Sequence, residues 1–120
     1  MNNKTILVIE DNKLNMKLVR SLLKIGNYTI LEAVDAESGI KLAREKNPDL
    51  VLMDIQLPGM DGLAATQILK ADGEITIIAL TSHAMEGDEK KVKEAGCDGY
   101  ITKPIDTRNF LQQVSDYLNE

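Results

Sequence analysis

Short uninterrupted apolar runs alternate along this chain with stretches in which apolar residues recur every three or four positions. An uninterrupted run is typical of a strand buried on both faces, and the longer spacing is typical of an amphipathic helix. The pattern predicts strands at 5–9, 29–33, 50–54, 75–80 and 99–102. The run at 50–54 is the most informative, because its apolar residues lead directly into the carboxylate of Asp54.

Polar residues with short side chains mark where the helices begin. Asn12 and Asp35 are expected N-caps, since such side chains accept hydrogen bonds from the free N–H groups of a first turn. Asp106 is expected to cap the last helix in the same way. Pro48 is expected to prevent the second helix from continuing past it. The predicted helices cover 14–25, the stretch between Asp35 and Pro48, 62–70, 86–95 and the stretch after Asp106.

The apolar stripes of these helices indicate which faces pack on the sheet. The inward side chains expected in the first helix are Leu14, Leu18, Leu22 and Ile25, with Val19 and Leu23 beside them. Those expected in the last helix are Phe110, Leu111, Val114 and Leu118. The helix at 86–95 offers little beyond Val92 and Ala95. We therefore expect it to be among the less stable elements.

Regular alternation of strand and helix predicts an α/β fold: a five-stranded, doubly wound parallel sheet with helices on both faces. Ligands of such sheets bind beside the carboxyl ends of the strands. The polar residues at or just after these ends are Glu10, Asp11, Asp54, Thr81 and Lys103. Because the carboxyl ends of parallel strands lie at one edge, we expect these residues to converge there.

The converging residues suggest metal-assisted phosphoryl chemistry. Three carboxylates in one crevice repel one another, and Mg²⁺, which prefers oxygen ligands, would relieve that repulsion. Asp54 could then act as a nucleophile toward phosphorus, since Asp carboxylates form aspartyl phosphates. Phosphoryl transfer also needs positive charge and hydrogen-bond donors around the transferred oxygens, which Lys103 and the Thr81 hydroxyl can supply.

Each of these residues also has a plain structural explanation when it is taken alone. Glu10 and Asp11 could be an acid pair favoured by the helix dipole. Asp54 could cap a loop, and Thr81 could end a strand because Thr favours strands. Their combination with Lys103 at one edge favours the chemical interpretation.

Composition and charge exclude several classes of protein. A chain of 120 residues with a formal net charge of -5 is one domain of ordinary size. The single cysteine, Cys97, allows no internal disulfide and indicates a cytoplasmic protein, in which this side chain is a small buried apolar group. The first residues show no signal region, and no apolar run is long enough for a membrane span. The acidic balance argues against nonspecific binding of nucleic acid.

The segments from Met53 to Gly62 and from Tyr100 to Pro104, with the acids and the lysine above, resemble the receiver domain of two-component response regulators. The resemblance covers essentially the whole chain, 1–120. It implies the flavodoxin-like strand order 2-1-3-4-5. It also implies a signalling protein rather than an enzyme, one that catalyses only its own phosphorylation and dephosphorylation.

The resemblance implies a role for each residue of the crevice. Asp54 would accept a phosphoryl group from a histidine kinase or a histidine phosphotransfer protein. Asp11 and Asp54 would bind Mg²⁺ directly, Glu10 would bind it through water, and Gln56 would offer its backbone carbonyl. Lys103 would pair first with Asp54 and then with the phosphoryl oxygens.

The output of such a protein is implied as well. Thr81 would move to hydrogen-bond the phosphoryl group, and Tyr100 would follow it inward, changing the face formed by 86–95, 99–102 and the last helix. Taken alone, Tyr100 could be an ordinary core aromatic. The expected downstream partner is a protein effector, with no nucleic acid and no membrane, and the chain is expected to be a monomer or a weak dimer. His83, the only histidine, has no partner spaced for metal binding and is expected in an exposed loop.

Other functions remain open at this point. An aspartyl-phosphate phosphatase of the haloacid dehalogenase type needs an Asp where Gln56 lies. A nucleotide or flavin binder would need phosphate-binding glycines, and neither G-x-G-x-x-G nor a P-loop is present. The chain could also be an interaction module that is never phosphorylated, or a receiver excised from a hybrid histidine kinase, although Met1 and the end at Glu120 favour a complete protein.

Finally, the Lys103–Pro104 peptide bond is predicted to be cis, so that Lys103 can turn back toward the crevice.

Overall fold

The computed structural model describes residues 4–57, 59–81 and 86–118. Strands and helices alternate throughout, as the sequence pattern predicts. The strands are β1 (Thr5–Ile9), β2 (Thr29–Ala33), β3 (Leu50–Asp54), β4 (Thr76–Thr81) and β5 (Gly99–Thr102). The helices are α1 (Lys13–Ile25), α2 (Ala36–Lys46), α3 (Gly62–Asp72), α4 (Glu86–Ala95) and α5 (Phe110–Tyr117).

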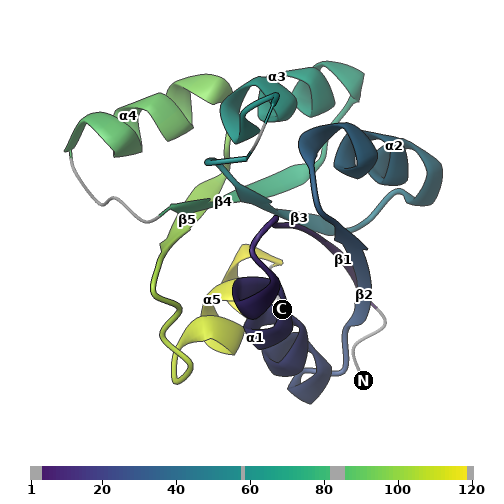
Figure 1. Cartoon of the computed structure of the whole chain (residues 1–120), viewed down its shortest axis with the longest axis vertical. Coiled ribbons are helices and arrows are strands. Elements are labelled where there is room, and N and C mark those ends of the chain that lie inside the picture. Colours follow the sequence, from purple (N-terminus) through teal and green to yellow (C-terminus); the bar gives the residue numbers. More distant parts are fainter. Residues whose placement is uncertain (1–3, 58, 82–85, 119–120) are drawn as a thin grey trace.

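All neighbouring strands run parallel, in the order β2-β1-β3-β4-β5. The order and the doubly wound architecture are therefore confirmed. Helices α1 and α5 cover one face of the sheet, and α2, α3 and α4 cover the other (Figure 1). The strand order reverses between β1 and β3, which places a ligand site at the carboxyl ends of these two strands.

The core consists of two apolar layers, one on each face of the sheet. Side chains that alternate along β1 and β3 supply both layers: Ile6 and Leu50 face α1 and α5, while Leu7 and Val51 face the other helices. Every residue of β3 is buried, including the terminal Asp54. Continuous apolar runs are needed in these strands because both faces are covered.

The inward face of α1 differs from the predicted stripe. Leu14 and Ile25 are 79% and 70% exposed, whereas Met16 and Val19 are buried. Leu22 and Leu23 are buried as well. The middle of the predicted stripe packs on the core as expected, through Leu18, Val19, Leu22 and Leu23. Its two ends are exposed, and Met16 packs inward in place of Leu14.

The caps agree with the prediction at two helices and differ at the third. Asn12 Oδ1 accepts hydrogen bonds from the N–H groups of α1, and Asp35 Oδ1 accepts one from Ser38 N. Asp106 is not the N-cap of α5. Its carboxylate accepts a hydrogen bond from Arg108 N, and a turn over 107–109 precedes the helix, whose N-cap position is Asn109. A local Asx turn thus replaces the predicted cap.

Candidate functional site

Three strands deliver the charged residues of the site to one edge of the sheet. Glu10 and Asp11 follow β1, Asp54 ends β3, and Lys103 follows β5. The register pairs Ile9 with Met53, so Glu10 and Asp54 extend from neighbouring positions. Lys103 reaches them from the connection after β5, where the Lys103–Pro104 peptide bond is cis as predicted.

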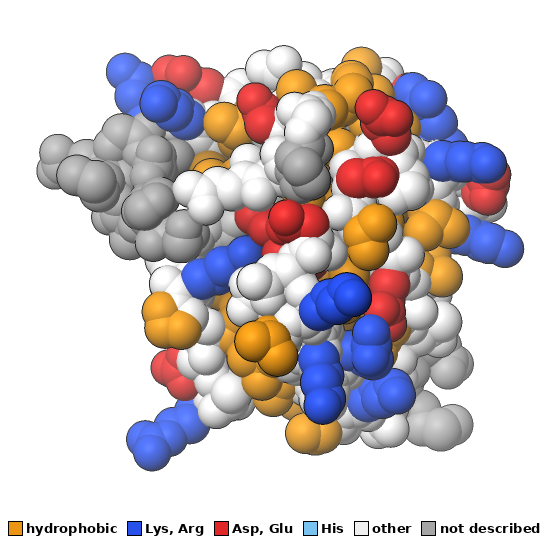
Figure 2. All heavy atoms as spheres, in the orientation of Figure 1, with side chains coloured by type: hydrophobic (Ala, Val, Ile, Leu, Met, Phe, Trp, Pro, Cys, Tyr) orange, Lys and Arg blue, Asp and Glu red, His pale blue; other side chains and the backbone are white. Residues whose placement is uncertain are grey.

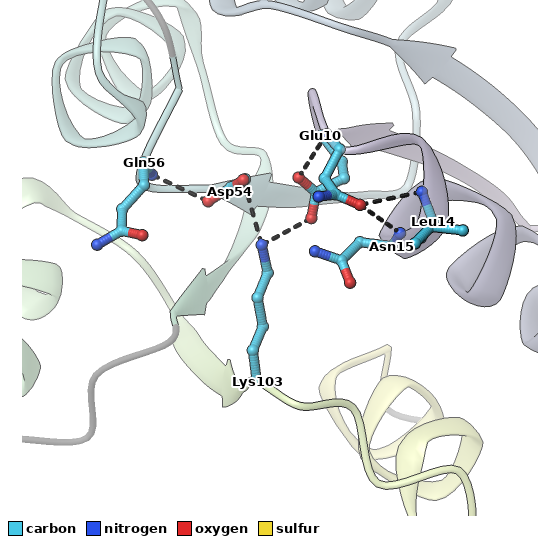
Figure 3. A network of polar contacts seen from close by, with 7 residues as sticks. Glu10, Leu14, Asn15, Asp54, Gln56 and Lys103 are labelled. Atoms are coloured by element: carbon cyan, nitrogen blue, oxygen red, sulfur yellow. Dashed lines mark hydrogen bonds and ion pairs between the residues drawn. The ribbon is translucent and has the colours of Figure 1, made fainter.

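Lys103 bridges the two buried carboxylates (Figure 3). Its Nζ lies 2.7 Å from Glu10 Oε1 and 3.2 Å from Asp54 Oδ2. Asp54 Oδ1 accepts a hydrogen bond of 2.9 Å from Gln56 N, and Glu10 Oε2 accepts one of 3.2 Å from Asn12 N. Glu10 is 1% exposed and Asp54 is 4% exposed. Two carboxylates are thus held inside the protein by a single ammonium group.

The electrostatics of this arrangement separate the two acids. Burial, with the neighbouring Asp54, raises the pKa of Glu10 from 4.5 to about 7. Burial opposes ionisation of Asp54 too, but hydrogen bonds from Glu10 and from Gln56 N, with the charge of Lys103, lower its pKa below the ordinary value. The carboxylates in turn raise the pKa of Lys103 in spite of its burial. Between the lowered pKa of Asp54 and the pKa of about 7 of Glu10, the pair therefore holds one proton, which Glu10 carries while Asp54 is ionised.

The acidic residues fit a hard divalent cation. Glu10, Asp11 and Asp54 each offer a carboxylate oxygen, and these oxygens lie within 4.8 Å of one another. Although Glu10 Oε1 is close to Lys103 Nζ, no described donor forms a hydrogen bond with this buried oxygen. A set of oxygen ligands that includes a buried oxygen without a hydrogen bond suits Mg²⁺.

An open cleft of about 520 Å³ gives access to these groups. Its lining consists of Glu10, Asp11, Asn12, Lys13, Asn15, Asp54, Gln56 and Lys103. Figure 2 shows acidic side chains gathered near the centre of this face, with Lys and Arg side chains gathered below them over α1. The sequence pattern did not indicate Lys13 or Asn15 as residues of the cleft. Asn15 is the third residue of the helix that begins soon after the end of β1, and this position could have indicated it.

Thr81 and Tyr100 lie beside the cleft rather than in its described lining. Thr81 is 4% exposed, and its carbonyl accepts a hydrogen bond of 2.7 Å from Lys103 N. Tyr100 pairs with Ala79, two residues before Thr81, so Thr81 and Tyr100 point to the same face of the sheet. Tyr100 is partly buried against the apolar layer under α2, α3 and α4. The two residues are therefore diagonal neighbours on one face of β4 and β5. His83 lies outside the described residues.

Comparison with known proteins identifies the family. Residues 6–115 match the response regulator receiver domain. The chain belongs to this family. The strand order and the two sequence segments noted above are thus those of a receiver domain.

Receiver proteins of known sequence and structure are similar along almost the whole chain. The polar-differentiation response regulators DivK of Brucella ovis and Brucella suis are each 43% identical over 120 residues, which is 98% of both chains compared. The receiver domain of a sensor histidine kinase from Pseudomonas aeruginosa PAO1, solved with a magnesium ion in its active-site cleft, is 28% identical, with a TM-score of 0.89 over 99% of this chain and 100% of that one.

A receiver bound to a phosphotransfer protein has the same fold. In a structure from Saccharomyces cerevisiae, the receiver domain of the response regulator Ssk1 is bound to the histidine phosphotransfer protein Ypd1. That match has a TM-score of 0.90, covers 96% of this chain and 88% of the other, and is 23% identical. At this identity the likeness concerns the fold.

Proposed function

We propose that this receiver, spanning residues 1–120, accepts a phosphoryl group on Asp54 from a histidine kinase or a histidine phosphotransfer protein. The observation that carries the proposal is the state of Asp54. It is a buried but ionised carboxylate at the base of a cleft, paired with Lys103 and bounded by two further acids. Similarity to the DivK response regulators and to the receiver domain of a sensor histidine kinase supports this function.

Asp54 has the properties of a nucleophile toward phosphorus. Because its pKa is lowered, its carboxylate holds a lone pair without needing a base to remove a proton. One of its oxygens forms a bond to phosphorus as the bond between phosphorus and the donor nitrogen breaks, and that electron pair stays on the nitrogen. The hydrogen bond from Gln56 N and the contact with Lys103 hold the carboxylate in place during this exchange.

The acids beside Asp54 would hold Mg²⁺. The ligands would be Asp11, Asp54 and the backbone carbonyl of Gln56, with Glu10 acting through water. The ion supplies positive charge that offsets the repulsion between the carboxylates and an anionic donor. Glu10, whose pKa is raised to about 7, would act through water in its ionised form.

Phosphorylation would then be transmitted along β4 and β5. Lys103 transfers its contact from Asp54 to the phosphoryl oxygens, and the Thr81 hydroxyl moves to hydrogen-bond them. Tyr100 shares a sheet face with Thr81 and follows it inward, so the surface made by α4, β5 and α5 changes shape for a protein effector. The chain thus acts in the cytoplasm as a signalling protein, monomeric or weakly dimeric, whose only reactions are its own phosphorylation and dephosphorylation. None of the described helices is long and apolar enough to cross a membrane.

The test is phosphorylation by a small donor. The protein is incubated with acetyl phosphate and Mg²⁺, and the covalent phosphoryl group is measured by intact mass. The parent should be labelled, chelation of the metal should abolish labelling, and Asp54→Asn should remain unlabelled. Asp116→Asn, an exposed acid on α5, is the matched control and should be labelled like the parent. Labelling of Asp54→Asn to the same extent, or labelling without metal, contradicts the proposal.

A further inference from the structure

Asn15 is a polar residue of the cleft to which the proposed reaction assigns no role. It is the third residue of α1, and it lines the cleft together with Asp54 and Lys103. Its side chain is neither fully buried nor fully exposed. Figure 3 shows its carboxamide extending from α1 toward the part of the cleft between Glu10 and Lys103. The fold thus places the carboxamide of Asn15, an uncharged group that can donate and accept hydrogen bonds, beside Glu10 and Lys103.

The usual structural role of a polar residue at this helix position is absent. In a capping box, the third helical side chain accepts a hydrogen bond from the backbone N–H of the N-cap residue. Here the N–H of the N-cap residue, Asn12, is directed to Glu10 Oε2 at 3.2 Å. The Asn12 side chain instead accepts a hydrogen bond of 3.0 Å from Asn15 N, so the helix start is satisfied without the Asn15 side chain.

The carboxamide of Asn15 is therefore available to a ligand. Within the described part of the chain, the side-chain oxygen and nitrogen of Asn15 make no hydrogen bond. The backbone N–H groups of Leu14 and Asn15 both donate to Asn12 Oδ1. The ammonium of Lys103 is already shared between Glu10 and Asp54. A phosphoryl group brings several anionic oxygens, each of which can accept more than one hydrogen bond, and Lys103 cannot serve them all.

We propose that Asn15 is a phosphoryl-binding residue whose amide N–H group donates a hydrogen bond to an oxygen of the phosphoryl group on Asp54. This inference rests on the proposed function. An amide suits the position because it adds a donor to a cleft that holds three acids and, unlike a fourth carboxylate, adds no repulsion toward an anionic donor. Figure 3 shows its side chain directed toward Lys103, the residue proposed to bind phosphoryl oxygens as well.

The experiment compares the parent with Asn15→Leu, which keeps similar bulk without hydrogen bonding, and with Asn15→Gln, which keeps the amide. Leu14→Ala, a change at the neighbouring exposed residue outside the cleft lining, is the control. The rate of phosphorylation by acetyl phosphate, the affinity for Mg²⁺ by calorimetry and the melting temperature are measured for each. Asn15→Leu should be phosphorylated about ten-fold more slowly, the effect expected for one lost hydrogen bond to a charged group. The Mg²⁺ affinity of Asn15→Leu should change by less than about two-fold. Asn15→Gln should be phosphorylated faster than Asn15→Leu but more slowly than the parent. Leu14→Ala should be phosphorylated at the rate of the parent.

Failure of this inference can be told apart from failure of the proposed function, because the latter requires that the parent itself be phosphorylated on Asp54. With a reactive parent, an Asn15→Leu rate within about two-fold of the parent overturns the inference, since a lost hydrogen bond to a charged oxygen has a larger effect. An equal loss of Mg²⁺ affinity and rate also overturns it, because Asn15 would then act on the waters around the metal. A slower reaction with unchanged metal affinity supports it.

Discussion

Replacing Glu10 by Gln should remove most of the pH dependence of stability of the metal-free protein between pH 5 and pH 8. Glu10 is 1% exposed, and its pKa is raised from 4.5 to about 7, mainly by burial. A carboxyl group with a raised pKa keeps its proton in the folded protein after the unfolded chain has lost it. Its contribution to stability is therefore complete below pH 4.5 and is lost as the pH rises through about 7.

The size of this effect follows from the pKa. Each pKa unit corresponds to about 1.4 kcal/mol, so the rise in the pKa of Glu10 sets a ceiling of roughly 3 kcal/mol. The proton is shared with Asp54 and Lys103 lies next to both, so we expect a measured loss of about 1–3 kcal/mol in the free energy of unfolding. Gln keeps the shape of Glu10 without an ionisable proton, and Glu10→Gln should be the more stable protein at pH 8.

Urea unfolding at several pH values, with a chelator present, measures this difference. Glu32→Gln is the control, because Glu32 is exposed and its pKa is lowered by the hydrogen bond from Arg20. Glu32→Gln should change the pH dependence of stability only below pH 4.5. Between pH 5 and pH 8, the free energy of unfolding should therefore vary with pH as it does in the parent. Added Mg²⁺ should restore the stability of the parent at pH 8, because the ion binds ionised carboxylates of the folded state. A parent whose stability does not change with pH, or a Glu10→Gln protein with the parental slope, would refute the reasoning.

Three further predictions concern the backbone near the site, the switch and the dynamics. Gly62→Ala should lower the free energy of unfolding by about 2–4 kcal/mol, since a Cβ there would lie 2.3 Å from the Asp54 carbonyl oxygen; urea unfolding no different from the parent would contradict this. Thr81→Ala should accept a phosphoryl group on Asp54 but leave the NMR signals of Tyr100 unshifted, and a parental shift would show that Thr81 is not the link. Hydrogen exchange should be faster in α4 than in β3, because α4 is anchored by few apolar side chains while β3 is wholly buried; equal protection would show that α4 is as stable as the sheet.

Local patterns along the sequence determined the order of elements and the location of the site. Uninterrupted apolar runs must become strands covered on both faces, and their alternation with amphipathic stretches leaves a doubly wound parallel sheet as the economical arrangement. In a parallel sheet the carboxyl ends of all strands lie at one edge. The acids at the ends of β1 and β3 and the lysine after β5 are therefore expected there even when no distances are known. The proposed nucleophile, the acids beside it and the lysine could therefore be named from their places at the strand ends.

Only the tertiary structure decided which side chains are buried and how their charges interact. The apolar spacing of α1 predicted Leu14 as an inward residue, and packing against the sheet buried Met16 instead. The opposite pKa shifts of Glu10 and Asp54 depend on burial and on contacts of about 3 Å with Lys103, which is far away in the sequence. Asn15 lines the cleft, and the backbone N–H of Asn12, which a capping box would direct to it, binds Glu10 from the end of β1 instead. These outcomes depend on distances between separate elements, and a sequence pattern specifies an element's face or its end but not those distances.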